Sequence, residues 1–138
     1  MTLRFAAVLN FILAGGHIAV MPWLDTAFRI YGIDRLMNGI AAHGAALPYI
    51  ITAAIASCFA LCGLYALSAD GAIRRLPMLW PGVFFVSAVF LLRAAIGIII
   101  MTNSGQYPLT DSLSAIVSSV IGLLYLAGGA ERIRSAER

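Results

Sequence analysis

Charged residues are scarce in this sequence: they make up 11% of its 138 residues, and none of them is a lysine. An ordinary soluble domain carries about 25% charged residues. Hydrophobic residues make up 62% of the chain, and the mean hydropathy is +0.95. A soluble domain of this length could not bury so many apolar side chains, because small domains keep a large share of their surface exposed. The composition therefore indicates a single domain that uses lipid as its apolar environment.

The basic residues are spread along the chain and form no basic patch. All nine are arginines, and the formal net charge is +3. Except for Arg93, they lie between or beyond long apolar runs, which is typical of topology signals in membrane proteins. Nucleic-acid binding would require a basic footprint, so we expect no nucleic-acid partner.

Only two cysteines are present, and both lie inside an apolar run, so they provide no disulfide framework. Cys58 and Cys62 have the spacing C-x3-C rather than the redox spacing C-x-x-C. We interpret them as packing residues, with soft-metal binding as the alternative. The sequence also lacks a Ser-His-Asp order, a pair of carboxylates within a span and a phosphate-binding glycine loop. We therefore expect no catalytic residues, cofactor or metal, and the sequence favours a non-enzymatic role without deciding it.

Four apolar runs are long enough to cross a bilayer as helices. They predict an all-α membrane protein, an antiparallel four-helix transmembrane bundle, with spans at about 5–24, 48–67, 78–101 and 109–128. The first run could pass for a secretory signal peptide, but no A-x-A-like site follows it, so we interpret it as a retained span. Gly15 and Gly16, and the row Ser114, Ser118 and Gly122, predict close helix approach. Gly128 and Gly129 are expected to end the fourth span.

The connection between the first two spans, residues 25–47, has a helical pattern of its own. Ile33, Leu36, Met37 and Ile40 recur at helical spacing, opposite polar residues. This pattern predicts a short amphipathic helix that lies on the membrane surface or caps the bundle.

The arginines also predict the orientation of the four spans. Six of them would lie on one side, two on the other, and Arg93 within the membrane. The larger group is Arg4, Arg74, Arg75, Arg132, Arg134 and Arg138, and the smaller group is Arg29 and Arg35. By the positive-inside rule, both termini are then cytoplasmic, and the first and third connections face outward.

Arg93 is the basic residue placed deep inside a span. It lies eight residues from the outer end of residues 78–101, about 12 Å deep at about 1.5 Å per residue. A charge at the centre of a bilayer costs roughly 2.5–3.5 kcal/mol. Arg93 therefore either extends its stem to the interface or pairs internally, or it binds an anionic head group, a carboxylate or a carbonyl in an outward-facing pocket.

Other polar residues are expected in the same outer half. Asp111 is interpreted either as the partner of Arg93 or as a helix N-cap, because T-D-S before an apolar run is typical of a cap. Tyr49 and Tyr107 are further candidates for the lining of a pocket.

His17 shares a helix face with Asn10 and is expected at about the depth of Arg93. A histidine in a span forms a hydrogen bond between helices, relays protons or binds a metal. The first interpretation is preferred. A metal or haem site would also use His43, but the two histidines have no spacing signature.

Three strings in the second half carry a resemblance: GLYALSADGAIRRLPML from Gly63, VFLLRAAIG and SSVIGLLYLAGG. His17 and the pattern P-Y-x-x-T of residues 48–52 add to it. The chain resembles a group of uncharacterised small four-span bacterial inner-membrane proteins. The resemblance implies the topology and a bacterial inner membrane, and it carries over no activity and no site residues.

Together these observations favour a small integral inner-membrane protein that binds a lipid or other amphiphile in an outward-facing polar pocket. Arg93 would hold the polar head, with His17, Asp111, Tyr49 and Tyr107 as lining. The alternatives are an accessory subunit or homo-oligomeric structural protein, and a small transporter or channel component. The expected partners are membrane lipids, an amphiphilic ligand, and further copies of the chain or a larger membrane complex.

Overall fold

The computed structural model describes residues 1–136, and all regular elements in that range are helices. The long helices are α1 (Thr2–Ala19), α4 (Leu47–Asp70), α5 (Leu79–Ser104) and α6 (Leu109–Ala136). The short ones are the 3-10 helix η1 (Met21–Trp23), α2 (Leu24–Ile30) and α3 (Asp34–Ala41). Each long helix has the length and apolar composition needed to cross a membrane. The predicted all-α bundle with four long apolar helices is therefore confirmed.

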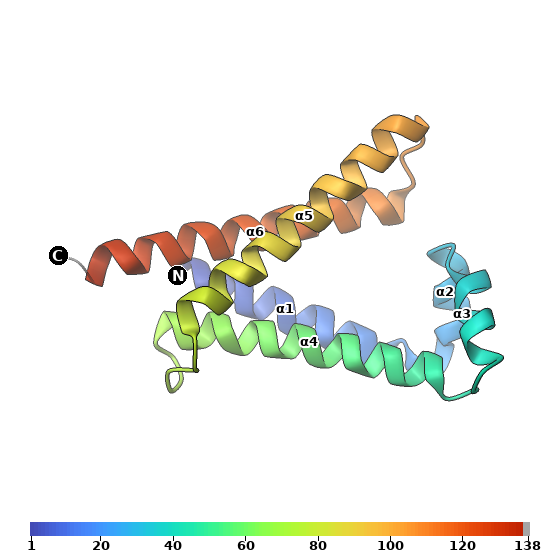
Figure 1. Ribbon diagram of the computed structural model, residues 1–138, viewed down its shortest axis with the longest axis horizontal. Coiled ribbons are helices and arrows are strands. Elements are labelled where there is room, and N and C mark those ends of the chain that lie inside the picture. The colour runs from blue at the N-terminus through green and yellow to red at the C-terminus, as the bar shows by residue number, and fades with distance from the viewer. Residues whose placement is uncertain (137–138) are drawn as a thin grey trace.

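The long helices form two pairs. Helix α1 packs along α4, and α5 packs along α6, while smaller contacts of α1 with α6 and of α4 with α5 join the pairs. The pairs meet at the end that carries Met1, the 71–78 link and the last turns of α6, and they diverge toward the other end (Figure 1). We call the first the closed end. The open end carries α2, α3 and the 105–108 link.

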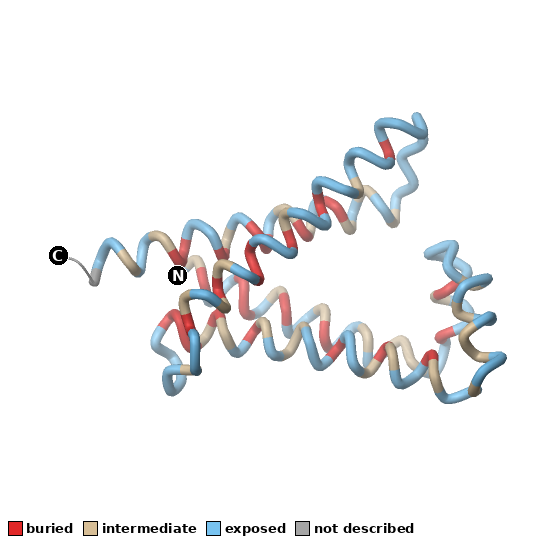
Figure 2. Tube along the Cα trace, viewed as in Figure 1, coloured by how far each residue is buried: buried red, intermediate tan, exposed pale blue. Residues whose placement is uncertain are grey.

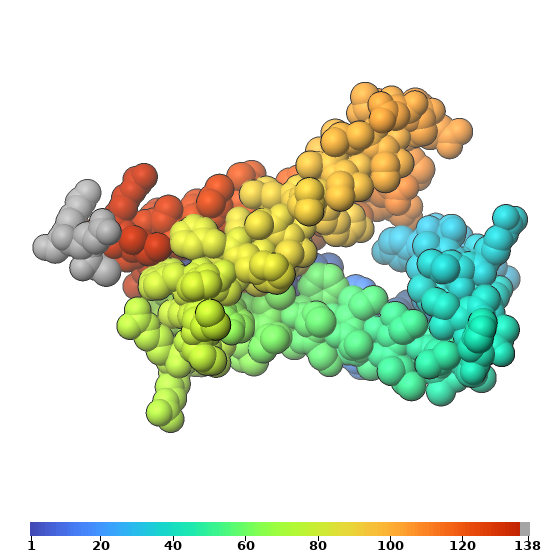
Figure 3. Space-filling view, viewed as in Figure 1, coloured from blue at the N-terminus to red at the C-terminus, as the bar shows by residue number. Residues whose placement is uncertain are grey.

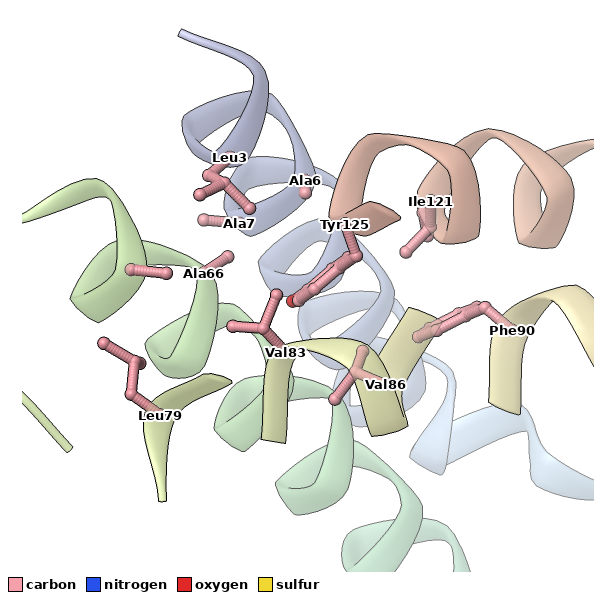
Figure 4. Close-up of a cluster of buried hydrophobic side chains, with 11 residues drawn as sticks. Leu3, Ala6, Ala7, Ala66, Leu79, Val83, Val86, Phe90, Ile121 and Tyr125 are labelled. Carbon is pink, nitrogen blue, oxygen red and sulfur yellow. The ribbon is translucent and has the colours of Figure 1, made fainter. Parts of the chain in front are cut away.

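The main apolar core lies at the closed end, where all four long helices meet (Figure 2). It is built from buried side chains of every long helix (Figure 4): Leu3, Ala6, Ala7, Ala66, Ala69, Leu79, Val83, Val86, Phe90, Ile121 and Tyr125. The four alanines bring the backbones close together, as small residues do in membrane bundles. Toward the open end the same helices are mostly exposed.

Two helices have other bounds than the predicted spans. Helix α1 ends at Ala19, before residue 24, and the chain turns through η1, where Pro22 has no N–H for a helical hydrogen bond. Helix α6 continues through Gly128 and Gly129 to Ala136, and the two glycines allow Leu3 of α1 and Val83 of α5 to approach α6 closely.

The small residues differ in what they contact. Gly122 lies against Leu91 of α5, as the predicted row in the fourth span required. Gly15 and Gly16 have open space where a side chain would be, so the prediction that they allow close helix packing is wrong. The predicted amphipathic helix is confirmed as α3, and a second short helix, α2, precedes it.

The end of α4 determines how the chain enters the second pair. Gly71 has a φ of +82°, which favours glycine. Its N–H donates to the Ser68 carbonyl, and the N–H of Ala72 donates to the Leu67 carbonyl, the two bonds of a Schellman cap. This cap ends α4 at Asp70 and leaves that carboxylate beside the start of α1 and the last turns of α6.

Candidate functional site

A buried carboxylate ties three helices together at the closed end. The Asp70 side chain is 3% exposed and forms ion pairs with Arg4 of α1 and Arg132 of α6. An Arg132 terminal nitrogen donates to Asp70 Oδ1 at 2.9 Å and to the Asp70 carbonyl at 2.6 Å. The two cations offset the unfavourable placement of a carboxylate at a helix C-terminus. The arrangement is a structural tie, since the two guanidinium groups already occupy both carboxylate oxygens.

Sequence reasoning missed this tie, because Asp70 precedes Gly71 in a pair typical of a turn and the arginines were interpreted as topology signals. A signal was present. The predicted topology places Asp70 on the same side as Arg4 and Arg132, where carboxylates are few and arginines are many.

A second polar contact lies inside the core. Asn10 is fully buried, and its Nδ2 donates to the Ala6 carbonyl at 2.8 Å and to the Tyr125 hydroxyl at 3.3 Å. That hydroxyl donates in turn to the Cys62 carbonyl of α4 at 2.6 Å. The network links α1, α6 and α4, so it helps hold the two helix pairs together. Tyr125 was also missed, because a lone tyrosine in an apolar run has no distinguishing pattern.

Three rings cross between the pairs where the bundle begins to open. His17 of α1 lies 5.1 Å from Phe59 of α4, and Phe59 lies 6.1 Å from Phe90 of α5, between ring centroids. We call these three residues the aromatic bridge. The His17 Nδ1 donates to the Leu13 carbonyl at 2.8 Å, within its own helix. We expected His17 to form a hydrogen bond to another helix, and this bond is instead within α1.

A groove of about 440 Å³ lies on the α5–α6 pair beyond the aromatic bridge. Its lining is aliphatic apart from two charged side chains, and consists of Val89, Leu92, Arg93, Ile96, Gly97, Ile100, Met101 and Asp111. Figure 3 shows that the molecule is hollowed between the open ends of the two pairs.

The groove faces the hollow between the pairs. Val89, Arg93, Ile96 and Ile100 follow Gly82 at intervals that repeat on one helix face. At the closed end, Gly82 of that face lies directly against the Tyr65 ring of α4. Further along α5 the same face has lost contact with the α1–α4 pair, because the pairs diverge, and its residues are exposed or half-exposed.

Arg93 extends toward the open end. One terminal nitrogen donates to the Ser114 hydroxyl at 2.5 Å. Gly97 faces Ala115 across the pair, so Ser114, one residue beyond Ala115, lies about 7.5 Å further toward the open end than the Arg93 backbone, at about 1.5 Å per residue. The arginine thus moves its charge outward along its aliphatic stem. Ser114, predicted only as a packing residue, is its partner.

Asp111 is not the ion-pair partner of Arg93. Within residues 1–136, both ion pairs involve Asp70, and Asp111 forms none. Asp111 is not an N-cap either, because α6 begins at Leu109 and places Asp111 in its first turn. A carboxylate there is stabilised by the helix dipole. It lines the groove one helical turn nearer the open end than Ser114.

The remaining predicted site residues lie outside the groove lining. Tyr49, in the first turn of α4, and Tyr107, in the 105–108 link, are exposed at the open end. His17 belongs to the aromatic bridge, on the opposite helix pair. The structure thus brings together Arg93 and Asp111 but not the other three. In the part of the chain from 1 to 136, no three His, Cys, Asp or Glu side chains are grouped to hold a metal ion.

The fold and the groove define a class: a helical bundle with four helices able to cross a membrane, closed by core packing at one end and open beside an apolar, charged groove at the other. Comparisons of the chain with protein-family models, with curated proteins and with solved structures find no match.

Proposed function

We propose that this is a multi-pass bacterial inner-membrane protein that binds a lipid or other amphiphile in the groove around Arg93. The observation that carries the proposal is the exposed guanidinium of Arg93 in the middle of an apolar helix, within a groove of aliphatic side chains. A guanidinium has five N–H donors, and Ser114 accepts from one nitrogen of this one. An anionic head group would accept from the others, with a stronger, charge-assisted geometry.

The distribution of arginines supports an antiparallel transmembrane arrangement with cytoplasmic termini. Arg4, Arg74, Arg75, Arg132 and Arg134 lie at or near the closed end. Arg29 and Arg35 lie in α2 and α3 at the open end, and Arg138 lies outside the described residues. The positive-inside rule then makes the closed end cytoplasmic, so the groove opens toward the outer leaflet.

The apolar part of the groove accounts for the rest of the ligand. Val89, Leu92 and Ile96 lie along α5 on the closed-end side of the contact between Arg93 and Ser114. An acyl chain along them would cover apolar surface on the side where the helix pairs have separated. Inside a bilayer such a chain would be held by packing and not by the hydrophobic effect, because lipid tails are as apolar as the groove wall.

The experiment is native mass spectrometry of gently extracted protein: wild type, Arg93→Gln and the control Arg35→Gln, which removes an exposed arginine outside the groove. We expect the wild type and Arg35→Gln to carry a bound amphiphile mass and Arg93→Gln to lose it. A bare chain in all three, or the same bound mass in Arg93→Gln, would contradict the proposal. A co-purifying protein or a defined oligomer without bound amphiphile would favour an accessory or structural role.

A further inference from the structure

The groove contains one cation and one anion that do not pair with each other. Arg93 donates to Ser114, and Asp111 has no ion-pair partner within residues 1–136. Both side chains line the same groove. Two opposite charges held in one groove without neutralising each other are arranged to bind a molecule that carries both charges.

The charges lie in a fixed order along the groove. Asp111 is nearest the open end, and the Arg93 guanidinium, held at Ser114, lies one helical turn deeper, about 4.5 Å along the axis. Val89 and Leu92 extend deeper still. Ile100 and Met101 flank the two charges, and from the open end inward the groove presents a negative charge, a positive charge and then a wall that is aliphatic alone.

We propose, building on the proposed function, that the ligand is an aminophospholipid, a zwitterion with a primary ammonium and a phosphate. In such a lipid the ammonium is outermost, the phosphate follows after a two-carbon unit, and the acyl chains lie deepest. This order matches Asp111, Arg93 and the aliphatic wall in turn. The ammonium donates to the carboxylate of Asp111, and the phosphate accepts from the guanidinium of Arg93.

Charge balance distinguishes this lipid from two common alternatives. An anionic phosphoglycerol head would leave the Asp111 carboxylate without a cation and close to an added negative charge, which repels it. A phosphocholine head carries a cation without N–H groups, so it cannot donate to the carboxylate. The aminophospholipid leaves neither charge of the groove unmatched.

The test is lipid competition in mixed nanodiscs, read out by native mass spectrometry. The nanodiscs contain phosphatidylethanolamine, phosphatidylglycerol and phosphatidylcholine in equal amounts. We expect the wild type to retain phosphatidylethanolamine about tenfold over either competitor, as the loss of one charge-assisted hydrogen bond implies. Asp111→Asn is expected to abolish that preference and still bind phospholipid, whereas Arg93→Gln is expected to lose all three. Asp25→Asn, which removes an exposed carboxylate from α2, is the control and should keep the preference.

The outcomes separate this inference from the proposed function. If Arg93→Gln loses lipid while Asp111→Asn keeps the wild-type head-group preference, the aminophospholipid assignment is overturned and the amphiphile groove stands. Equal retention of the three lipids by the wild type overturns it as well. If the wild type retains no lipid, both fail. Thermal unfolding of each variant confirms that the comparison is made on folded protein.

Discussion

The closed and open ends of the bundle are made from the same four helices but held by different interactions. At the closed end, alanines and glycines bring the helices together, and Asp70 and Tyr125 each connect three of them. At the open end, Ile96 and Ile100 of α5 are 48% and 61% exposed. Close packing, the ion-paired Asp70 and hydrogen bonds between helices fix the first region. The second keeps apolar and charged side chains available, which is what a binding groove requires.

The largest effect should come from Asp70→Asn at the closed end. The substitution leaves Arg4 and Arg132 facing a neutral side chain, and breaking a buried ion pair costs about 3–5 kcal/mol. Both arginine side chains are about half exposed or more, so water solvates them when the carboxylate is removed. We therefore expect a loss of unfolding free energy near the lower limit of that range. Thermal unfolding in detergent micelles measures it.

Asp25→Asn provides the control for Asp70→Asn, because Asp25 is exposed on α2 and forms no ion pair in residues 1–136. Its unfolding temperature should equal that of the wild type. Equal temperatures for Asp70→Asn and the wild type would mean that the tie does not hold the closed end together.

Gly122→Ala is expected to be the next most damaging change. An added Cβ would lie 2.7 Å from Leu91 Cγ and 3.1 Å from the Leu91 backbone nitrogen, so α5 and α6 would have to separate. Overpacking of this kind costs about 1–3 kcal/mol. Gly15→Ala is the matched test, because a Cβ added at Gly15 would have no neighbouring atom within 4 Å. Alanine also stabilises a helix by up to about 1 kcal/mol relative to glycine.

The two glycine variants should therefore change the free energy of unfolding in opposite directions. Denaturation in mixed micelles gives both values. A destabilising Gly15→Ala would show that another chain packs on that face of α1.

Tyr125→Phe should cause a smaller loss. It removes the hydrogen bond to the Cys62 carbonyl and one partner of the buried Asn10 amide. Hydrogen bonds between helices in a membrane contribute about 0.6 kcal/mol on average and up to about 1.7 kcal/mol. Tyr107→Phe, at an exposed tyrosine of the 105–108 link, should have no effect on the unfolding temperature. Equal losses for the two variants would contradict a specific role of the core network.

Apart from the controls, Arg93→Gln is expected to change stability least, although we expect it to abolish the proposed binding. The arginine is exposed, and its hydrogen bond to Ser114 is within one helix pair, so it does not hold the two pairs together. We expect a change within about 0.5 kcal/mol in lipid-free micelles. A loss as large as that of Asp70→Asn would show that Arg93 is a structural residue, and would remove the contrast between the two ends.

Much of the fold could be predicted from the sequence. The apolar runs predict the four long helices, and the spacing of Ile33, Leu36, Met37 and Ile40 predicts α3. The errors came from residues whose role depends on a neighbour. Gly128 resembles a helix end but packs against Leu3, and Gly15 resembles a packing site but faces open space. A glycine has the same local propensity in both situations.

The candidate site was predictable in part. A charge in an apolar helix is costly wherever that helix lies, so Arg93 could be selected from the sequence alone. Its partner could not be predicted. Ser114 and Asp111 both lie near the start of the next helix, and only the alignment of α5 with α6 decides which of them Arg93 contacts. The expected contribution of Tyr49 and Tyr107 depended on how α4 and the 105–108 link lie relative to α5, and both tyrosines lie outside the groove lining.

The sequence by itself determined the composition of the helices. Period, length and hydropathy are local properties, and they predict four long apolar helices with one charge, Arg93, in the middle of an apolar run. The tertiary structure decided which residues meet. The core, the Asp70 tie and the groove all depend on contacts between helices far apart in sequence, and a one-residue shift in helix alignment would replace each of these contacts by another. For this reason the helices could be predicted from the sequence, while the divergence of the two pairs, and the groove beside it, required the structure.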